Sequence, residues 1–340
     1  MMGLWSILGS GGFGWLRMLF RMSCLANLSI SSKPARYTYT DLPTYTHANT
    51  IQQDSWFDEV KPSGSAAFFA YSMPSLYALT SRLPILRNSR MFHSWKILQA
   101  RGDDALHNIR NSNGSHNAFA HVFKAGEANT LTDEEVRVEA AAFMIAGSDT
   151  TSNTLTYLIY AILNNPDVRA VLTEELDVLD DFTDASLEAC TILSAVIKET
   201  LRLYNAAPTP FPRVVPSSGA ELGGHFIPGG TVVMSQSWSV HRDPTIFPDP
   251  DRFDYTRWLP DRVTEAATAS FVPFGAGTRA CIGKHLAMME LRYGTALFFK
   301  KFPKAQLAPE TTPESMEMRN LVLIEPMSGV CKVVLNSGEA

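Results

Sequence analysis

A cysteine stands at the junction of a glycine-rich loop and the start of a helix in the sequence FVPFGAGTRACIGKHLAMMEL, which begins at Phe271. The cysteine is Cys281, and Gly275 and Gly277 precede it. The N–H groups at the beginning of a helix stabilise negative charge and favour the thiolate, the form of cysteine that binds a soft metal. Because glycine has no side chain, a flat cofactor can come close to the backbone. The loop could therefore hold a metal-containing cofactor.

Two other interpretations of Cys281 stay open at this point. As a nucleophile it would need a base, and His285 lies four residues further along the same helix. Such a pair seldom aims both groups at one substrate, and no third residue that would orient the histidine is evident. As a structural residue, Cys281 would be a buried, unreactive thiol in a turn. The wide spacing of the cysteines argues against a disulfide framework or a zinc site; they are Cys24, Cys190, Cys281 and Cys331.

A long helix is expected to position the second group of candidate residues. Thr132 and Glu135 have the types and spacing of a capping box, and helix-forming residues then continue to Pro166. A helix of this length spans about 50 Å, which is enough to cross a domain of this size. We therefore expect its centre to be buried.

The centre of this helix has the unusual sequence AGSDTT, from Ala146 to Thr151. Gly147 destabilises a helix by about 1 kcal/mol relative to alanine, and Thr150 can donate a hydrogen bond to the carbonyl of Ala146. This bond loosens the helix and leaves backbone groups for a ligand or water. A crowded helix crossing, at which Gly147 lets a neighbour approach, explains the glycine equally well.

A third group of candidate residues lies on a helix predicted over residues 187–204. Glu199 and Arg202 are three positions apart on one face of it. Such a pair is usually solvated and contributes little stability. Apolar residues flank this pair on both sides, however, so its burial is plausible. A buried pair would need further hydrogen-bond partners.

The other predicted elements are shorter. Apolar residues at helical spacing predict two helices between Pro74 and Arg110. Further along, the chain changes to β-type sequence with frequent turns. It predicts a strand over 221–227, a turn at 228–230 and a second strand over 231–233.

The composition indicates a globular protein and limits its partners. The chain has 340 residues, of which 45% are hydrophobic and 19% charged, and 29 basic against 34 acidic side chains give a net charge of −5. No basic run is present, so nucleic acid is not an expected partner. The apolar segment 3–16 is shorter than the roughly 20 residues that a transmembrane helix needs, so we expect no clean anchor. An interfacial anchor stays open.

A glycine pattern near the N-terminus allows a different function. Gly9, Gly11 and Gly14 imitate the dinucleotide fingerprint, which would make the protein a nicotinamide-dependent oxidoreductase. The first acidic residue after this pattern lies 27 residues beyond Gly14, and the chain between them has no βαβ pattern. A second imitation at 275–280 is preceded by Pro273, where a strand would be needed.

Together these segments resemble one family, the haem-thiolate monooxygenases known as cytochromes P450. The family's cysteine loop has the pattern Phe-x-x-Gly-x-Arg-x-Cys-x-Gly, its long helix carries Ala/Gly-Gly-x-Asp/Glu-Thr-Thr/Ser, and another helix carries Glu-x-x-Arg. The patterns occur in the expected order, and the resemblance covers roughly residues 70–335. The matching residues are Phe274, Gly277, Arg279, Cys281 and Gly283, the segment 146–151, and Glu199 with Arg202.

The resemblance implies which residues bind the cofactor. Cys281 would be the thiolate ligand of the haem iron and would push electron density that favours cleavage of the O–O bond. Phe274 and Gly275 would lie against the haem. Arg279 and Arg213 would pair with the haem propionates, because a guanidinium fork suits a carboxylate.

The resemblance also implies roles away from the cysteine loop. Asp149 and Thr150 would organise the water chain that delivers protons to iron-bound dioxygen, and they are the expected catalytic residues. Arg257 would complete a buried structural network with Glu199 and Arg202.

The implied fold is mainly α-helical with small β-sheets, a cytochrome P450 fold that lacks much of its N-terminal third. Residues 1–69 would be an atypical N-terminal segment and residues 70–340 the haem domain. The implied reaction is hydroxylation or oxidation of an apolar small molecule, a fungal secondary metabolite such as a terpenoid or polyketide. Dioxygen and electrons from NADPH-cytochrome P450 reductase would be used, and the family predicts association with the endoplasmic reticulum membrane.

The chain also departs from the family pattern. Tyr255 and Thr256 stand where the third arginine motif usually has Pro-Glu, and the chain before residue 70 shows no family features. Family members are considerably longer. A truncated haem-binding fragment with impaired catalysis is therefore the alternative to a competent enzyme, because loss of a pocket wall exposes the iron to water.

Overall fold

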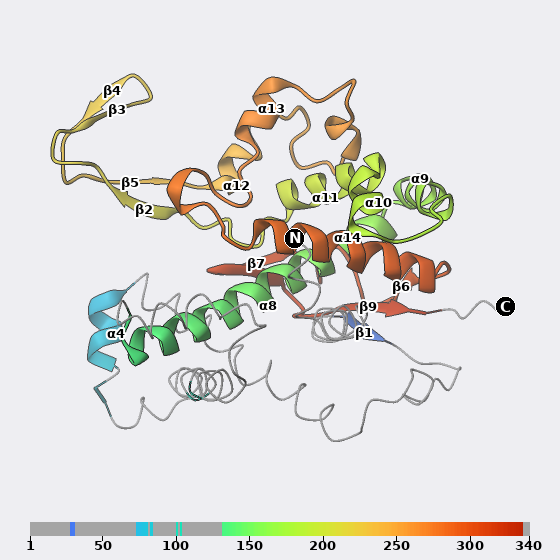
Figure 1. Ribbon diagram of the computed structural model, residues 1–340, viewed down its shortest axis with the longest axis horizontal. Helices are drawn as coiled ribbons and strands as arrows, with labels where there is room; N and C mark the ends of the chain where they lie inside the picture. Colours follow the sequence, from blue (N-terminus) through green and yellow to red (C-terminus); the bar gives the residue numbers. More distant parts are fainter. Residues whose placement is uncertain are drawn as a thin grey trace.

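The computed structural model describes residues 28–30, 73–80, 82–83, 100, 103 and 131–335, and this part is mainly helical with small β-sheets (Figure 1). The predicted fold class is thus confirmed at the level of secondary structure. The α-helices are α4 (Pro74–Thr80), α8 (Asp133–Leu163), α9 (Pro166–Asp177), α10 (Asp184–Ala189), α11 (Thr191–Leu203), α12 (Ser237–Val240), α13 (Glu265–Ser270) and α14 (Lys284–Lys301), and two 3-10 helices are η1 (Tyr255–Trp258) and η2 (Gly277–Arg279).

Helix α8 begins at the predicted capping box. The Thr132 side chain accepts a hydrogen bond from the backbone N–H of Glu135, and the Thr132 N–H donates to the Glu135 carboxylate over 2.7 Å. Three acidic residues in the first turn complement the positive end of the helix dipole. The helix ends at Leu163, and Pro166 starts α9, where its missing N–H costs nothing.

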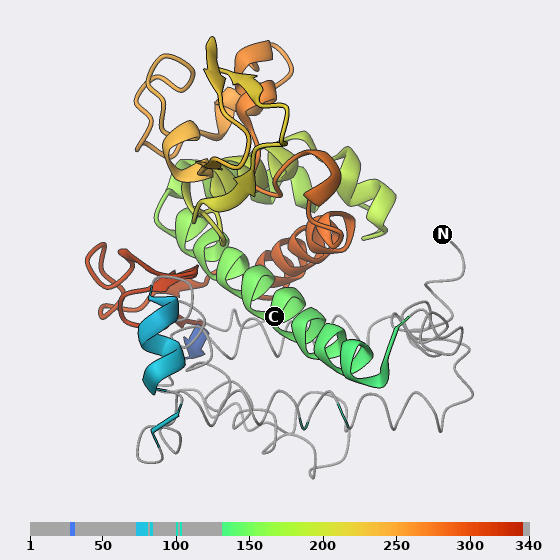
Figure 2. The same ribbon diagram turned by 90° about the vertical axis from the view of Figure 1, so that its left-hand side faces the viewer.

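The burial of α8 differs from the prediction. Residues 151–162 are buried, but most of the first half is exposed or half-buried, including Ala146 and Gly147. The reason is that α9, α11 and α14 pack against the second half of α8 (Figure 2). The expectation that the middle of the helix is buried was therefore wrong at 146–150 and right from Thr151 onwards.

The hydrophobic core lies where α8, α9, α11 and α14 meet. Each of these helices contributes buried apolar side chains to it. Gly294 of α14 lies against Leu155 of α8, and a Cβ atom at Gly294 would lie 3.0 Å from the Leu155 Cδ2. Glycine thus lets α14 come close to α8. Fully buried core residues include Leu158, Ile159 and Ile162 of α8, Leu172 of α9, and Leu193, Val196 and Ile197 of α11.

The helix predicted over 187–204 is interrupted in the structure. The backbone is extended at Cys190, with φ −67° and ψ 113°, so α10 ends before it and α11 begins after it. The first turn of α11 is stabilised by Glu175 of α9, whose carboxylate accepts hydrogen bonds from the backbone N–H groups of Ile192 and Leu193 over 2.7 and 2.8 Å. This cap comes from a different helix, so local sequence did not predict it.

In the described residues the β-structure consists of three two-stranded antiparallel sheets and one three-stranded sheet. Strands β2 and β5, β3 and β4, and β7 and β8 form antiparallel pairs, and the sheet has the order β1-β9-β6 with β1 parallel to β9. The strands are β1 (Leu28–Ile30), β2 (Phe211–Val214), β3 (Ala220–Leu222), β4 (His225–Ile227), β5 (Val232–Ser235), β6 (Gln306–Leu307), β7 (Met318–Leu321), β8 (Leu323–Pro326) and β9 (Cys331–Val334).

The strand-turn-strand prediction over 221–233 was wrong in its turn. The chain reverses at Gly223 and Gly224, which both have positive φ (57° and 78°), and β3 pairs with β4 across this turn. Two such glycines suit a tight hairpin whose twist matches its strands. The segment 228–230 instead connects β4 to β5, which pairs with β2.

Several predictions fall outside the described residues. They include the glycine pattern at 9–14, the apolar segment 3–16 and most of the second helix predicted before Arg110. Among the residues that the structure places, no helix is long and apolar enough to cross a membrane.

Candidate functional site

The loop that carries Cys281 is held in a folded turn by its own backbone. The Gly275 N–H donates to the Val272 carbonyl over 3.0 Å, and the Cys281 N–H donates to the Phe274 carbonyl over 2.8 Å. Gly275 and Gly277 both have a φ of 69°, which only glycine adopts without strain. No strand precedes this loop in the structure, so its glycines do not form a dinucleotide fingerprint.

Cys281 is exposed and sits at the start of α14. Its Sγ lies 3.8 Å from the position that a Cβ atom would take at Gly283, the N-cap of the helix. No side chain caps this N-terminus. The sulfur therefore lies close to the N-terminal end of α14, where the sequence predicted it. The exposure of Cys281 is a correction to the interpretation that it is a buried, inert thiol.

The other residues expected to bind the cofactor are exposed or half-buried. Arg279 and Arg213 are exposed, and neither forms an ion pair with an acidic side chain among the described residues. Within the part of the chain that the structure describes, the Arg213 guanidinium donates to the adjacent Pro212 carbonyl over 2.9 Å and to no other group. Phe274 is half-buried and packs against the hydrophobic core, while Gly275 is exposed.

This arrangement fits a flat, apolar group that carries carboxylates. A Cβ atom at Gly277 would meet no described atom within 4 Å, and at Gly275 the nearest would lie 3.9 Å away, so both glycines leave room above the backbone. Ile282 is 85% exposed although it is apolar. A thiol, two cations without acidic partners and uncovered apolar surface are the features that a haem with its propionates would cover.

Hydroxyl groups loosen the middle of α8. The Thr150 hydroxyl donates to the Ala146 carbonyl over 2.6 Å, which confirms the predicted bond. Thr154 makes the same kind of bond to the Thr150 carbonyl over 2.8 Å, and Thr156 makes it to the Ser152 carbonyl over 2.9 Å. A Cβ atom at Gly147 would meet no described atom within 4 Å, so a crowded crossing of described elements does not explain this glycine. Asp149 and Thr150 are half-buried.

Helix α14 connects the cysteine loop to α8. The Thr151 hydroxyl donates a hydrogen bond to the Glu290 carboxyl group, and both residues are buried. Burial raises the pKa of Glu290 to about 7, and the bond from Thr151 opposes this shift. Six residues separate Lys284 from Glu290, so the start of α14 lies about 9 Å along its axis from this contact. Helix α14, which starts after Cys281, therefore contacts α8 at the residue that directly follows the Asp149–Thr150 pair.

Glu199 and Arg202 form a fully buried ion pair behind the cysteine loop. The Arg202 Nε and Nη2 atoms donate to the two Glu199 oxygens over 2.9 and 2.8 Å. The remaining Arg202 donors bind the carbonyls of His241, Pro250 and Arg252 over 2.7, 2.6 and 3.2 Å. A buried charge pair is tolerated when its hydrogen-bonding capacity is used in this way.

The Glu199 carboxylate has further partners of its own. It accepts hydrogen bonds from the Asp254 N–H and the Trp258 indole N–H, both over 2.9 Å. The Arg257 Nε lies 3.4 Å from it, and the Arg257 Nη2 donates to the Asp249 carbonyl over 3.0 Å. The structure thus brings together Glu199, Arg202 and Arg257. Sequence reasoning missed Trp258, although it directly follows Arg257.

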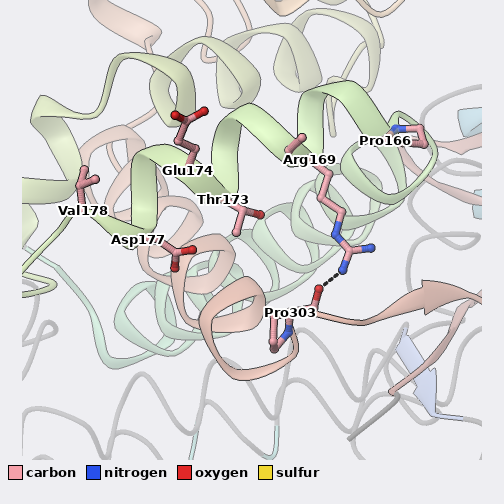
Figure 3. A pocket seen from close by; sticks show the side chains of 8 residues that line it. Pro166, Arg169, Thr173, Glu174, Asp177, Val178 and Pro303 are labelled. Carbon is pink, nitrogen blue, oxygen red and sulfur yellow. Dashed lines mark hydrogen bonds between the residues drawn. The ribbon is translucent and has the colours of Figure 1, made fainter. Parts of the chain in front are cut away.

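A second hollow lies away from these residues, between α9 and the turn after α14 (Figure 3). This open groove has a volume of about 600 Å³. Its one arginine, Arg169, donates to the carbonyls of Pro303 and Ala305. Because these carbonyls already engage the guanidinium, the groove offers little to an anionic ligand.

The sequence matches a known family over most of its length. Residues 66–333 match the family model described as cytochrome P450. The chain belongs to the cytochrome P450 family. Haem is the cofactor of cytochromes P450, and the thiol, arginines and glycines described above fit it.

Curated fungal relatives are also cytochromes P450. The monooxygenase aflV of Aspergillus parasiticus is 47% identical over 215 residues, which are 62% of this chain and 42% of that protein. The monooxygenase stcB of Emericella nidulans is 40% identical over 254 residues, 73% of this chain and 49% of that protein. This cytochrome P450 chain thus spans about half the length of the curated relatives it matches.

Solved cytochrome P450 structures share the fold. The haem domain of cytochrome P450DA superposes with a TM-score of 0.68 at 20% identity, covering 95% of this chain and 68% of that one. A retinoic acid-bound cyanobacterial cytochrome P450 gives a TM-score of 0.70 at 22% identity, covering 95% and 69%. These likenesses confirm the predicted cytochrome P450 fold.

Proposed function

We propose that the protein is a haem-thiolate monooxygenase that inserts one oxygen atom of dioxygen into an apolar small molecule. The observation that carries this proposal is the exposed Cys281 thiol at the uncapped start of α14, on a helix that packs against the hydroxyl-rich stretch of α8. The fungal relatives, whose names describe them as cytochrome P450 monooxygenases, support it.

Each candidate site residue has a proposed task. Cys281 holds the haem iron through its thiolate, which is the ligand type that promotes oxygen activation in this family. Arg279 and Arg213 bind the two haem carboxylates through charge-assisted hydrogen bonds. Phe274 and Gly275 form the surface on which the cofactor rests. When bound, haem supplies the dioxygen chemistry that no side chain can supply.

The proposed proton path lies on α8. While its single hydrogen is donated to the Ala146 carbonyl, the Thr150 hydroxyl can accept a hydrogen bond from a water, and Asp149 beside it can hold and release a proton. The half-burial of both residues keeps them in reach of a few waters while limiting bulk solvent. Glu199, Arg202 and Arg257 act at a distance, because their network fixes the segments that flank the cysteine loop.

The proposed substrate is apolar, a fungal secondary metabolite such as a terpenoid or polyketide. It would lie between the α8 segment near Ala146 and the chain at 206–210. That second segment is held in place, because the Ala206 carbonyl accepts the Ile324 N–H over 2.9 Å and the Thr209 hydroxyl donates to the Val322 carbonyl over 3.1 Å. NADPH-cytochrome P450 reductase is the proposed electron donor, and association with the endoplasmic reticulum membrane is proposed from the family alone.

One observation favours a second candidate, a haem-binding protein with impaired turnover. The apolar side chains around Arg213 are open to solvent in the described part of the chain, with Phe211 51%, Val214 68% and Met234 57% exposed. An open wall would let water reach the iron and uncouple the reaction.

Turnover under isotopically heavy dioxygen separates the two candidates. The haem-loaded chain would be incubated with the reductase, NADPH and a panel of apolar terpenoids and polyketides. A product that carries one heavy oxygen atom supports the monooxygenase. Haem binding with NADPH consumption and only hydrogen peroxide or water as products supports the impaired protein and contradicts the main proposal.

A further inference from the structure

A buried histidine joins the Glu199–Arg202 pair to the cysteine loop. His241 follows α12 and has no exposed surface. Its Nε2 lies 3.0 Å from the Val272 backbone nitrogen, and its Nδ1 lies 3.2 Å from the Arg202 carbonyl oxygen. Neither the family motifs nor the proton path described above uses this residue.

The two bonds determine the tautomer of the ring. A backbone N–H can only donate, so Nε2 must accept from Val272 and carries no proton. The Nδ1 atom then carries the proton and donates it to the Arg202 carbonyl. Burial, together with the positive charges of Arg202 and Arg242, lowers the pKa of His241 to about 4, so the ring is neutral near pH 7.

The same residue is fixed on two further sides. The Arg202 Nη1 donates to the His241 carbonyl over 2.7 Å. His241 is therefore bonded to Arg202 through both its backbone and its ring. The ring also stacks on Phe271, with 5.7 Å between ring centroids and 25° between the planes. Phe271 in turn packs against Trp258, which binds Glu199.

A short series of hydrogen bonds leads from His241 to the thiol. The ring accepts the Val272 N–H, the Val272 carbonyl accepts the Gly275 N–H, and the Phe274 carbonyl accepts the Cys281 N–H. The first bond attaches the loop to His241, whose other ring nitrogen is bonded to Arg202 of α11, and the other two bonds fold the loop. Without the first bond the loop would keep its turn but lose its attachment at Val272.

We propose that His241 is a positioning residue, whose ring fixes the entry of the cysteine loop against α11 and thereby sets the orientation in which Cys281 meets the haem iron. This inference rests on the proposed function. It concerns the hydrogen bond to Val272 in particular, because a ring that acted through packing alone would not need a hydrogen-bond acceptor at Nε2.

Two substitutions separate the bond to Val272 from the bond to Arg202. In His241→Gln the side-chain oxygen can take the place of Nε2 and accept from Val272. In His241→Asn the shorter amide can take the place of Nδ1 and donate to Arg202, but it cannot reach Val272. The pair therefore tests which ring nitrogen matters while both variants keep a neutral polar group.

The readouts are haem affinity of the haem-free chain and the ferrous–carbon monoxide spectrum of the loaded chain. We expect His241→Gln to stay close to wild type. We expect His241→Asn to lose about tenfold in haem affinity and to shift toward an imidazole-like or thiol-type spectrum, because one buried hydrogen bond is lost. Equal behaviour of the two variants, whether both intact or both impaired, overturns the proposal.

A measurement on the unaltered chain covers the case in which His241→Asn does not fold. Hydrogen exchange of the haem-free wild type should show a slowly exchanging Val272 amide, whereas a rapidly exchanging one contradicts the proposal. This result is independent of haem. If wild type shows the slow amide but no thiolate-type spectrum, the proposed function fails while the attachment of the loop stands.

Discussion

Thr151 of α8 donates a hydrogen bond to the buried carboxyl group of Glu290 on α14. Thr151 directly follows the pair proposed to move protons, and Glu290 lies on the helix that starts behind Cys281. The contact is thus a polar link between the two helices that carry the candidate chemistry. The Glu290 carboxyl group is buried, and no ionic partner is among the groups that shift its pKa. Its ionisation should therefore affect the stability of the protein measurably.

Glu290→Gln is expected to change how stability depends on pH. Burial raises the folded-state pKa of Glu290 from 4.5 to about 7, so between these values the folded state binds more protons than the unfolded state. The contribution of Glu290 to stability therefore falls as pH rises through this window, by up to about 3 kcal/mol. Relative to wild type, Glu290→Gln should become more stable across the window, as measured by urea unfolding.

The control for Glu290 is Glu174→Gln, which removes an exposed carboxylate on α9. Its stability difference from wild type should stay nearly constant over the same pH range. A Glu290→Gln difference that is equally flat would show that Glu290 is not a buried acid.

His241→Gln should produce the opposite pH dependence. The pKa of His241 is lowered from 6.5 to about 4, so between these values the unfolded state binds more protons. The contribution of His241 to stability is present above this window and is lost as pH falls through it, by up to about 3 kcal/mol. Unfolding curves measured at both ends of the window should show that wild type loses stability relative to His241→Gln as the pH falls. If the difference in free energy of unfolding between the two proteins is the same at both pH values, the ring is not buried and neutral.

Arg202→Lys is expected to be strongly destabilising although it keeps the charge. The Arg202 guanidinium makes two bonds to Glu199 and donates to three backbone carbonyls, and a lysine ammonium has only three donors. Leaving buried groups without partners should cost about 3 to 5 kcal/mol in the free energy of unfolding. Arg319→Lys is the control: this arginine is 43% exposed, its pair with Glu325 lacks the buried carbonyl partners of Arg202, and the change should cost less than about 1 kcal/mol. Similar losses at both positions would contradict the network.

Arg279→Gln and Arg213→Gln should each weaken haem binding with little effect on folding. Both guanidiniums are exposed and form no ion pair in the described part of the chain, so their removal breaks no acidic contact. Each lost charge-assisted bond to a propionate should lower haem affinity about tenfold in a titration of the haem-free chain. Lys300→Gln, at the far end of α14 from Cys281, should bind haem as wild type does. Unchanged affinity in both arginine variants would place the propionates elsewhere.

The sequence predicted those features that depend on neighbouring residues. The capping box at Thr132 and Glu135 and the bond from Thr150 to Ala146 follow from short-range backbone geometry, and both are present. The pairing of Glu199 with Arg202 follows from helical spacing.

The features that sequence analysis missed depend on contacts between distant segments. The break at Cys190 depends on Glu175 from α9, and the attachment of Val272 depends on His241, thirty-one positions earlier. The turn at Gly223 and Gly224 was present in the sequence but was assigned to the proline and glycines at 228–230. The adjacent glycines at 223 and 224 were a stronger turn signal than the segment 228–230, because both can adopt the positive φ that a tight hairpin turn needs.

The thiolate spectrum tests the central claim most directly. The chain would be expressed with a haem precursor, reduced and exposed to carbon monoxide, beside Cys281→Ser and the control Cys190→Ser, which alters a buried thiol at the start of α11. Wild type and Cys190→Ser should give the absorption band of a thiolate-bound haem, and Cys281→Ser should lack it. A thiolate-type band that survives in Cys281→Ser, or its absence from wild type, would contradict the assignment of Cys281 as the iron ligand.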